Sequence, residues 1–267
     1  MEKPIEISPF EIGRFTDPET YNQVIEFHSK SNYSLIPGIT NRCYLSSAPD
    51  KILSEMVESE LSIWPSIKSS VQLTGKRTSI LRDESAEFFD DTQTLEFSVI
   101  DKLLIESFSA RNSESRKRPY PSGGGLYPID VFVCRVSEKI SDWPTGDSIL
   151  HLLPLSKQLE SMTAHSPENI LSDLSGGDSG LLGRPHFALV YAIFFERAIF
   201  KYRTRGYRLA LMEAGSMYQT ADLNAKILGL RSRPWAGFTD FQVAKTIGID
   251  MRSMAPLVVQ FFGNASN

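Results

Sequence analysis

One stretch of the chain combines stiff ends with a bare backbone that another molecule could approach closely. It reads Arg-Pro-Tyr-Pro-Ser-Gly-Gly-Gly-Leu-Tyr-Pro at residues 118–128. Prolines fix φ and remove backbone donors, whereas consecutive glycines carry no Cβ that would keep a ligand away. The N–H groups from Ser122 to Leu126 and the Ser122 hydroxyl can donate hydrogen bonds. The stretch therefore predicts either a platform for a flat or anionic ligand or a purely structural turn.

The common nucleotide-binding motifs do not fit this glycine loop. A phosphate-binding P-loop has lysine and then Ser or Thr directly after its last glycine, but Leu126 and Tyr127 stand there. The dinucleotide-binding loop follows a strand, whereas the predicted strand at residues 129–136 comes after this loop.

A second stretch could supply acid–base chemistry. Residues 196–208 read Glu-Arg-Ala-Ile-Phe-Lys-Tyr-Arg-Thr-Arg-Gly-Tyr-Arg, with cations crowded among aromatic residues. Like charges and partial burial both disfavour an ammonium ion. Lys201 could then act as an uncharged base, with Tyr202 as an acid or proton relay. The alternative is a basic turn that keeps its cations in water.

A third stretch could hold phosphate. Residues 76–82 read Lys-Arg-Thr-Ser-Ile-Leu-Arg, which sets Arg77 and Arg82 on either side of Ser79. Guanidinium and hydroxyl donors match phosphate oxygens. The alternative is an ordinary solvated surface.

Local signals place the elements that must position these residues. Asp17 followed by Pro18 predicts a helix start, and Ser98 with Asp101 predicts a capping box for a helix over residues 98–110. The continuously apolar residues 187–195 predict a strand covered on both faces.

The C-terminal third is predicted to contain one long helix. Residues 209–230 carry small side chains among leucines and methionines, which suits a central helix or a dimer interface. Residues 234–238 are predicted as an extended turn with a bare backbone at Gly237, and residues 257–262 as a last strand.

Composition limits the classes of protein. The chain has 267 residues, of which 41% are hydrophobic and 22% charged, as in a soluble globular protein. A formal net charge of −4 predicts no nucleic-acid binding. The two cysteines and four histidines lack zinc-ligand spacing, and a protein with so few cysteines suits a reducing cytoplasm. We expect no signal peptide and no membrane span. Residues 1–75 are predicted to form a separate layer, either a folding cap or a docking surface.

Together, these stretches resemble a known family. The residues that carry the resemblance are 118–128, Arg-Pro-His-Phe-Ala-Leu-Val-Tyr at 184–191, Phe-Lys-Tyr-Arg at 200–203, Leu-Met-Glu-Ala-Gly-Ser-Met-Tyr-Gln at 211–219, Trp-Ala-Gly at 235–237 and Pro-Leu-Val-Val-Gln-Phe-Phe-Gly at 256–263. They resemble the flavin-dependent azoline dehydrogenases, the SagB/ThcOx branch of the nitroreductase-like family, which are oxidase subunits of microcin-type thiazole/oxazole synthetases. The resemblance extends over nearly the whole chain and is strongest from about residue 98 to residue 263.

The resemblance implies a fold and a division of the chain. The expected fold is α+β and nitroreductase-like, with a mixed β-sheet flanked by helices. Residues 1–75 would be an N-terminal α-rich extension that docks partners or peptide, and residues 76–267 the FMN-binding domain. The resemblance further implies a homodimer with FMN at the subunit interface.

It also implies roles for individual residues. Lys201 would be the base and Tyr202 would assist proton transfer. Residues 234–238 align with the Pro-x-Glu-Gly-Phe segment that contacts the flavin in nitroreductases; here Ala236 replaces the glutamate, so only a backbone contact carries over. The basic stretch occupies roughly the place of the family's Arg-Arg-Ser-x-Arg phosphate site, with different spacing. The cofactor-binding residues predicted in this way are Arg77, Ser79, Arg82, Arg118, Pro121, Ser122, Gly123, Gly124, Leu126, Gln219, Trp235, Ala236 and Gly237.

The implied reaction is oxidation of peptide thiazolines and oxazolines to thiazoles and oxazoles in a ribosomally made, microcin-like peptide. The implied partners are a YcaO-type cyclodehydratase, a ThiF-like peptide-binding subunit and a precursor rich in Gly, Ser and Cys, in a bacterial cytoplasm. Two alternatives stay open at this point. One is a stand-alone NAD(P)H-dependent nitroreductase or flavin reductase, and the other is a flavin-binding assembly subunit.

Overall fold

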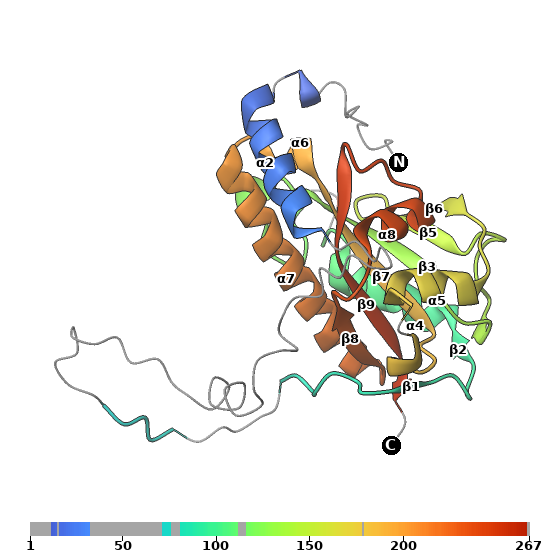
Figure 1. The fold of residues 1–267 in the computed structure, drawn as a ribbon. Coiled ribbons are helices and arrows are strands. Elements are labelled where there is room, and N and C mark those ends of the chain that lie inside the picture. Colours follow the sequence, from blue (N-terminus) through green and yellow to red (C-terminus); the bar gives the residue numbers. More distant parts are fainter. Residues whose placement is uncertain are drawn as a thin grey trace, which may run out of the picture. The chain divides into compact units, whose positions relative to one another are not determined.

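The computed structural model describes residues 12–14, 16–32, 71–75, 81–111, 116–177 and 179–265 (Figure 1). The chain divides into two compact units, one of residues 1–34 with 82–267 and the other of residues 35–81. All elements described below belong to the first unit. No helix among the described residues combines the length and apolar character needed to cross a membrane.

An antiparallel sheet forms the centre of this unit. Its path runs β1-β9-β7-β3-β5-β6, with β8 added to β9, and every pairing is antiparallel. Parallel pairing within the described strands joins β2 to β4 in a separate two-stranded sheet. The strands are β1 (Phe89–Asp90), β2 (Leu95–Glu96), β3 (Ile129–Arg135), β4 (Ile140–Ser141), β5 (Ile149–Leu153), β6 (Gln158–Thr163), β7 (Phe187–Phe194), β8 (Arg231–Trp235) and β9 (Met254–Ala265).

Helices cover both faces of the sheet, and two cores result. One core takes buried residues from α2, α4, α6 and α7, and the other takes them from α5 and α8. Alternate residues of β3 divide between the cores, because successive side chains in a strand point to opposite faces. This arrangement confirms the predicted α+β class. The helices are α2 (Pro18–Ser31), α4 (Phe97–Phe108), α5 (Pro167–Ser175), α6 (Phe195–Ile199), α7 (Thr204–Ile227) and α8 (Asp240–Ile247), with 3-10 turns η2 (Gly123–Gly125) and η3 (Ser179–Leu181).

The buried strand and the first helix start are confirmed. Every residue of β7 is buried, as its unbroken apolar sequence predicts. Asp17 caps α2, its side chain accepting a hydrogen bond from the Thr20 N–H at 3.1 Å. The buried face of α2 carries Val24 and His28, and His28 Nδ1 lies 3.0 Å from the Tyr207 Oη of α7. Helix α2 therefore packs beside the first turns of α7 (Figure 1).

The predicted capping box at α4 is wrong. The helix begins at Phe97, its N-cap is Glu96 without a side-chain capping bond, and Ser98 lies inside the first turn. The Ser98 hydroxyl donates to the Glu96 carboxylate at 3.1 Å. Because Glu96 also pairs with β4, its extended backbone sets the helix start before Ser98 is reached.

The long helix begins earlier than predicted. Helix α7 starts at Thr204 rather than Leu209, so part of the basic stretch is helical. Gly206 permits this, since a Cβ there would lie 2.0 Å from the Ala198 carbonyl oxygen of α6. The predicted turn at residues 234–238 also differs, because Pro234 and Trp235 pair with β9 as the end of β8. The last strand is longer than predicted and starts at Met254.

Candidate functional site

The glycine loop lies against the start of α7. A Cβ at Gly123 would lie 2.9 Å from Leu209 Cδ1, and a Cβ at Gly124 would lie 2.8 Å from Tyr202 Oη. Gly124 also has a φ of +66°, which disfavours any side chain. The absence of side chains therefore lets the loop approach Tyr202 and the first turns of the helix. The structure brings together two stretches that the sequence separates.

Part of the loop's donor set is used internally. The Gly125 N–H donates to the Ser122 carbonyl oxygen at 3.1 Å, and the Leu126 N–H donates to the Gly123 carbonyl oxygen at 3.4 Å. The prediction that all N–H groups from Ser122 to Leu126 are free is therefore wrong for these two. In the part of the chain that the structure describes, no hydrogen bond uses the N–H of Ser122, Gly123 or Gly124. These donors, with the exposed Gly124, form the face that a ligand can meet.

The end of the loop is strained and held from several sides. Tyr127 has a φ of +49°, which costs a non-glycine residue on the order of 1 kcal/mol. Its N–H donates to the Ser122 hydroxyl at 2.9 Å, and its carbonyl oxygen accepts from Arg197 Nη1 at 3.3 Å. The Arg118 guanidinium lies 4.2 Å from the Tyr127 ring centroid, and the Arg118 N–H donates to the Tyr127 hydroxyl. Arg118 thus supports the loop from behind.

Lys201 and Tyr202 form the α6–α7 connection beside the loop. Lys201 Nζ lies 5.4 Å from the Tyr202 ring centroid, within the range of a cation–π contact. Tyr202 is half-buried, whereas Lys201 is exposed in this chain. Partial burial of Lys201, which the local sequence argument assumed, is therefore not found in the single chain. Tyr202 nevertheless borders the exposed Gly124, and Lys201 lies beside Tyr202.

Sequence reasoning assigned no role to Glu213, whose surroundings in the structure are unusual for an acid. The inward face of α7 carries Ala210, Ala214 and Met217, and Glu213 lies among them with 3% of its surface exposed. Neither carboxyl oxygen has a hydrogen-bond partner of normal geometry. Burial raises the pKa of Glu213 to about 7, although the Ser122 hydroxyl and the Arg118 and Arg197 guanidiniums partly counter this. The sequence signal that could have revealed Glu213 was an acidic residue on the otherwise apolar face of a predicted helix.

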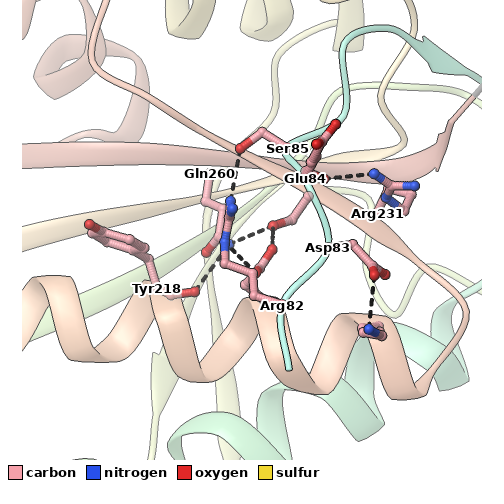
Figure 2. A network of polar contacts seen from close by, with 10 residues as sticks. Arg82, Asp83, Glu84, Ser85, Tyr218, Arg231 and Gln260 are labelled. Carbon is pink, nitrogen blue, oxygen red and sulfur yellow. Dashed lines mark hydrogen bonds and ion pairs between the residues drawn. The ribbon is translucent and has the colours of Figure 1, made fainter. Parts of the chain in front are cut away.

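Arg82, from the predicted phosphate-binding stretch, lies near the other end of α7 (Figure 2). Arg82 Nε lies 2.9 Å from Asp222 Oδ2, and Arg82 Nη2 donates to the Ser85 hydroxyl at 2.8 Å. Asp222 also accepts from the Ser232 hydroxyl at 2.5 Å. Arg82 is therefore engaged inside this chain. Arg77 and Ser79 lie outside the described residues.

The remaining predicted contacts lie around the end of β8. Trp235 packs against the core under α5 and α8, and its Nε1 donates to the Gly237 carbonyl oxygen at 3.0 Å. Ala236 lies between them and is exposed, and Gln219 is half-buried on α7.

The predicted residues thus lie in three places rather than one: beside the glycine loop, around Arg82, and at the end of β8. An α-helix rises 1.5 Å per residue, so the positions from Leu209 to Asp222 span about 20 Å along α7. The glycine loop, Lys201 and Tyr202 lie at the N-terminal end, and Arg82 lies near the C-terminal end.

The loop group fits a flavin ring. It offers an exposed backbone without side chains, N–H donors at its edge, and a tyrosine and a lysine next to it. A flat heterocycle with acceptor nitrogens and oxygens matches that chemistry. The residues that could hold it are Ser122, Gly123 and Gly124, with Pro121 and Leu126 at the margins.

Comparison with known proteins agrees with this fold. Residues 84–263 match the model of the nitroreductase family. The chain is 45% identical over 263 residues to the microcin B17-processing protein McbC of Escherichia coli, covering 98% of this chain and 97% of that protein. It is also 30% identical over 120 residues to the trifolitoxin-processing protein TfxB of Rhizobium leguminosarum bv. trifolii, which covers 44% of this chain and 31% of that protein.

A solved structure matches the same length. One chain of the Escherichia coli microcin synthetase McbBCD complex with truncated pro-MccB17 bound superposes with a TM-score of 0.90 at 45% identity. The match covers 98% of this chain and 99% of the other.

Proposed function

This chain belongs to the nitroreductase family, and we propose that it is an FMN-dependent dehydrogenase that processes a microcin-like peptide. Its substrates are thiazoline and oxazoline rings in the peptide, and its products are the aromatic thiazoles and oxazoles. The near full-length similarity to a microcin B17-processing protein supports this substrate class. A stand-alone nitroreductase is not expected to share 45% identity with a peptide-processing protein over 98% of its length.

The contact between Tyr202 and Gly124 carries the proposal. These residues are far apart in the sequence, yet a Cβ at Gly124 would fall 2.8 Å from Tyr202 Oη. The predicted proton-transfer pair therefore borders the predicted flavin platform. An azoline ring next to a flavin held on the glycine face would have its acidic Cα near Tyr202 and the neighbouring Lys201.

The reaction requires a proton and a hydride to leave adjacent ring carbons. Lys201, as an uncharged amine, accepts the proton from Cα, and Tyr202 orients the amine or relays the proton. FMN, when bound, supplies the two-electron acceptor for the hydride from the neighbouring methylene. The glycine loop orients the reacting groups, and because its glycines have no side chains, a ligand can contact its backbone directly. Each ring thus loses two hydrogens, one as a proton and one as a hydride.

The separation of the predicted residues along α7 supports a homodimer. If residues from both ends of α7 contact the same cofactor, a single chain cannot bring them together, because about 20 Å of helix separates them. A second copy could place its own residues opposite the glycine loop and cover Lys201, which is exposed in the single chain. Burial in the dimer would then favour the neutral amine.

We further propose that the chain works within a synthetase complex. The similarity to a chain of the microcin synthetase McbBCD complex with truncated pro-MccB17 bound supports this proposal. The partners would be a YcaO-type cyclodehydratase and a ThiF-like subunit that presents a precursor rich in Gly, Ser and Cys.

Mass spectrometry of a cyclised precursor peptide tests the function. Incubation with the purified protein, FMN and partner subunits should remove about 2 Da per ring, since each two-electron oxidation removes two hydrogens. Lys201→Ala should retain the flavin absorbance but lose at least about 100-fold in ring oxidation. Lys245→Ala, which changes an exposed lysine on α8, is the matched control and should act as the wild type.

Other outcomes would reject the proposal. A wild-type protein that binds no flavin, or that binds flavin but leaves the peptide mass unchanged in the complex, is not an azoline dehydrogenase. Rapid bleaching of bound flavin by NADPH without peptide oxidation would identify a reductase. Unchanged ring oxidation in Lys201→Ala would exclude Lys201 as the base.

A further inference from the structure

Glu213 combines features that ordinary packing does not explain. Its position on the inward face of α7 is otherwise apolar, and only 3% of its surface is exposed. Burying a carboxyl without hydrogen bonds is costly, because its hydration is lost and nothing replaces it. Both oxygens of Glu213 lack partners of normal geometry.

The carboxyl faces the back of the glycine loop. Leu209, one helical turn before Glu213, contacts the loop at Gly123. The Ser122 hydroxyl is close enough to Glu213 to lower its pKa, although burial raises that pKa by more. That hydroxyl also accepts the Tyr127 N–H at 2.9 Å, which helps to fix the strained end of the loop. Ser122 is therefore the connection between Glu213 and the loop.

The charged groups around Glu213 come from several elements. Arg118 precedes the loop, Arg197 lies on α6 and Asp130 lies on β3; the two arginines favour the carboxylate, and Asp130 disfavours it. The Tyr120 hydroxyl also interacts with Glu213, but it is uncharged at neutral pH. Burial outweighs the arginines and raises the pKa of Glu213 to about 7. When the glycine loop is packed on α7, the buried site therefore favours the neutral acid of Glu213 over the carboxylate.

We propose that Glu213 is a positioning residue that holds the glycine loop on α7 as a neutral acid and loosens it on ionisation. Opening the loop hydrates the carboxyl, and a hydrated carboxyl ionises more readily than a buried one. Opening is therefore coupled to proton release and is favoured as pH rises through about 7. Arg118 and Arg197 limit the effect without abolishing it. The consequence for cofactor binding rests on the function proposed above, whereas the effect on the loop does not.

Hydrogen exchange of the flavin-free protein tests the inference directly. After correction for intrinsic exchange, protection of the hydrogen-bonded amides of Gly125, Leu126 and Tyr127 should fall about tenfold between pH 6 and pH 8 in the wild type. Glu213→Gln keeps the shape of the neutral acid, so the loop should stay protected at both pH values. Glu213→Ala removes the support, and protection should be about tenfold lower even at pH 6.

Controls separate positioning from a general loss of structure. Asp173→Asn on α5 changes an acid to an amide on the opposite face of the sheet and should leave the loop's pH response intact. Far-ultraviolet circular dichroism checks that each variant folds. Equal loop protection in Glu213→Ala and the wild type at pH 6 would overturn the inference. So would a wild-type pH response that persists in Glu213→Gln.

Fluorescence titration with FMN then measures the consequence. The dissociation constant should rise about tenfold from pH 6 to pH 8 in the wild type and stay constant in Glu213→Gln, because a loosened loop binds the ring less well. A wild type that binds no FMN defeats the proposed function, while the exchange results still decide the role of Glu213. FMN binding with unchanged loop protection in all variants supports the function and overturns the inference.

Discussion

The two ends of α7 differ in how completely their polar groups are satisfied. Near its C-terminal end, Asp222 pairs with Arg82 and accepts from Ser232. Gln260 donates to the Ser232 hydroxyl at 2.9 Å and to the Tyr218 carbonyl oxygen at 3.2 Å, completing the network in Figure 2. At the N-terminal end the same helix carries Glu213, whose buried oxygens have no partner of normal geometry.

Backbone strain follows the same division. The positive φ values of Tyr127 and Arg203 lie at the loop end of the helix. Strained residues and unpaired buried groups cost stability, so they persist where function requires them. We therefore interpret the network around Asp222 as a source of stability and the loop end as the reactive region. The predictions below test this division by comparing changes at the two ends.

Removing the Asp222 carboxylate should have the largest effect on stability. Asp222→Ala leaves Arg82 and Ser232 without their acceptor, and the Asp222 side chain is only 11% exposed. We expect the free energy of unfolding to fall by about 2 kcal/mol, mainly because the buried Ser232 hydroxyl loses its acceptor, whereas Arg82 is 37% exposed and is partly solvated. Urea unfolding monitored by circular dichroism measures the loss.

Asp83→Ala is the matched control at the same end of the helix. Asp83 pairs with Lys226 at 2.8 Å, but both side chains are more than a third exposed. Its removal should cost about 0.5 kcal/mol or less. Equal costs for Asp83→Ala and Asp222→Ala would break the interpretation of the network as a buried source of stability.

Glu213 should make stability depend on pH at the loop end. Burial raises its pKa from 4.5 to about 7, so the folded state binds a proton that the unfolded state has lost. The stability contribution is complete below pH 4.5 and is lost as pH rises through about 7. The loss amounts to about 3 kcal/mol at most. Glu213→Gln should therefore gain stability relative to the wild type as pH rises from 5 to 8, as measured by urea unfolding.

The prediction is tested by how the stability difference between Glu213→Gln and the wild type changes with pH. A stability gap between the variant and the wild type that stays constant from pH 5 to pH 8 would mean that Glu213 is not protonated in the fold. A gap that narrows would mean that the two arginines outweigh burial.

Gly124→Ala should harm the chemistry more than the fold. The new Cβ would lie 2.8 Å from Tyr202 Oη, which must move. Displacing a catalytic group by about 1 Å costs on the order of 100-fold in turnover, or about 2.7 kcal/mol. The rate of ring oxidation in the peptide assay measures the effect.

Gly125→Ala is the control that separates backbone strain in the loop from displacement of Tyr202. Gly125 has a similar φ of +69°, but a Cβ there would meet nothing within 4 Å. We expect about 1 kcal/mol of backbone strain without displacement of Tyr202. Equal losses of activity in both variants would show that loop strain alone, rather than the Tyr202 contact, limits the reaction.

Tyr191→Phe should have a modest effect on stability and the smallest effect on ring oxidation. The Tyr191 hydroxyl donates to the Gln260 side-chain oxygen at 2.7 Å in a fully buried position. Leaving that oxygen unpaired should lower the free energy of unfolding by about 1–2 kcal/mol, with ring oxidation unchanged. Thermal unfolding and the peptide assay together measure this. A loss of activity at unchanged stability would show that the network also serves the chemistry.

The fold could be predicted wherever one segment determines its own structure. Apolar residues throughout β7 and the Asp17 cap of α2 carried their signals locally, and both predictions are confirmed. The predicted starts of α4 and α7 were wrong because distant partners decided them. Pairing of Glu96 with β4 fixed the first, and the close approach of α6 at Gly206 fixed the second.

The candidate site shows the same limit. The sequence alone determined which chemistry was available, because a loop without side chains and a lysine–tyrosine pair are properties of residue type and local spacing. Only the tertiary structure set Tyr202 against Gly124, engaged Arg82 with Asp222 and buried Glu213. These contacts join segments far apart in the chain, and burial depends on what surrounds a residue. No local pattern encodes either one.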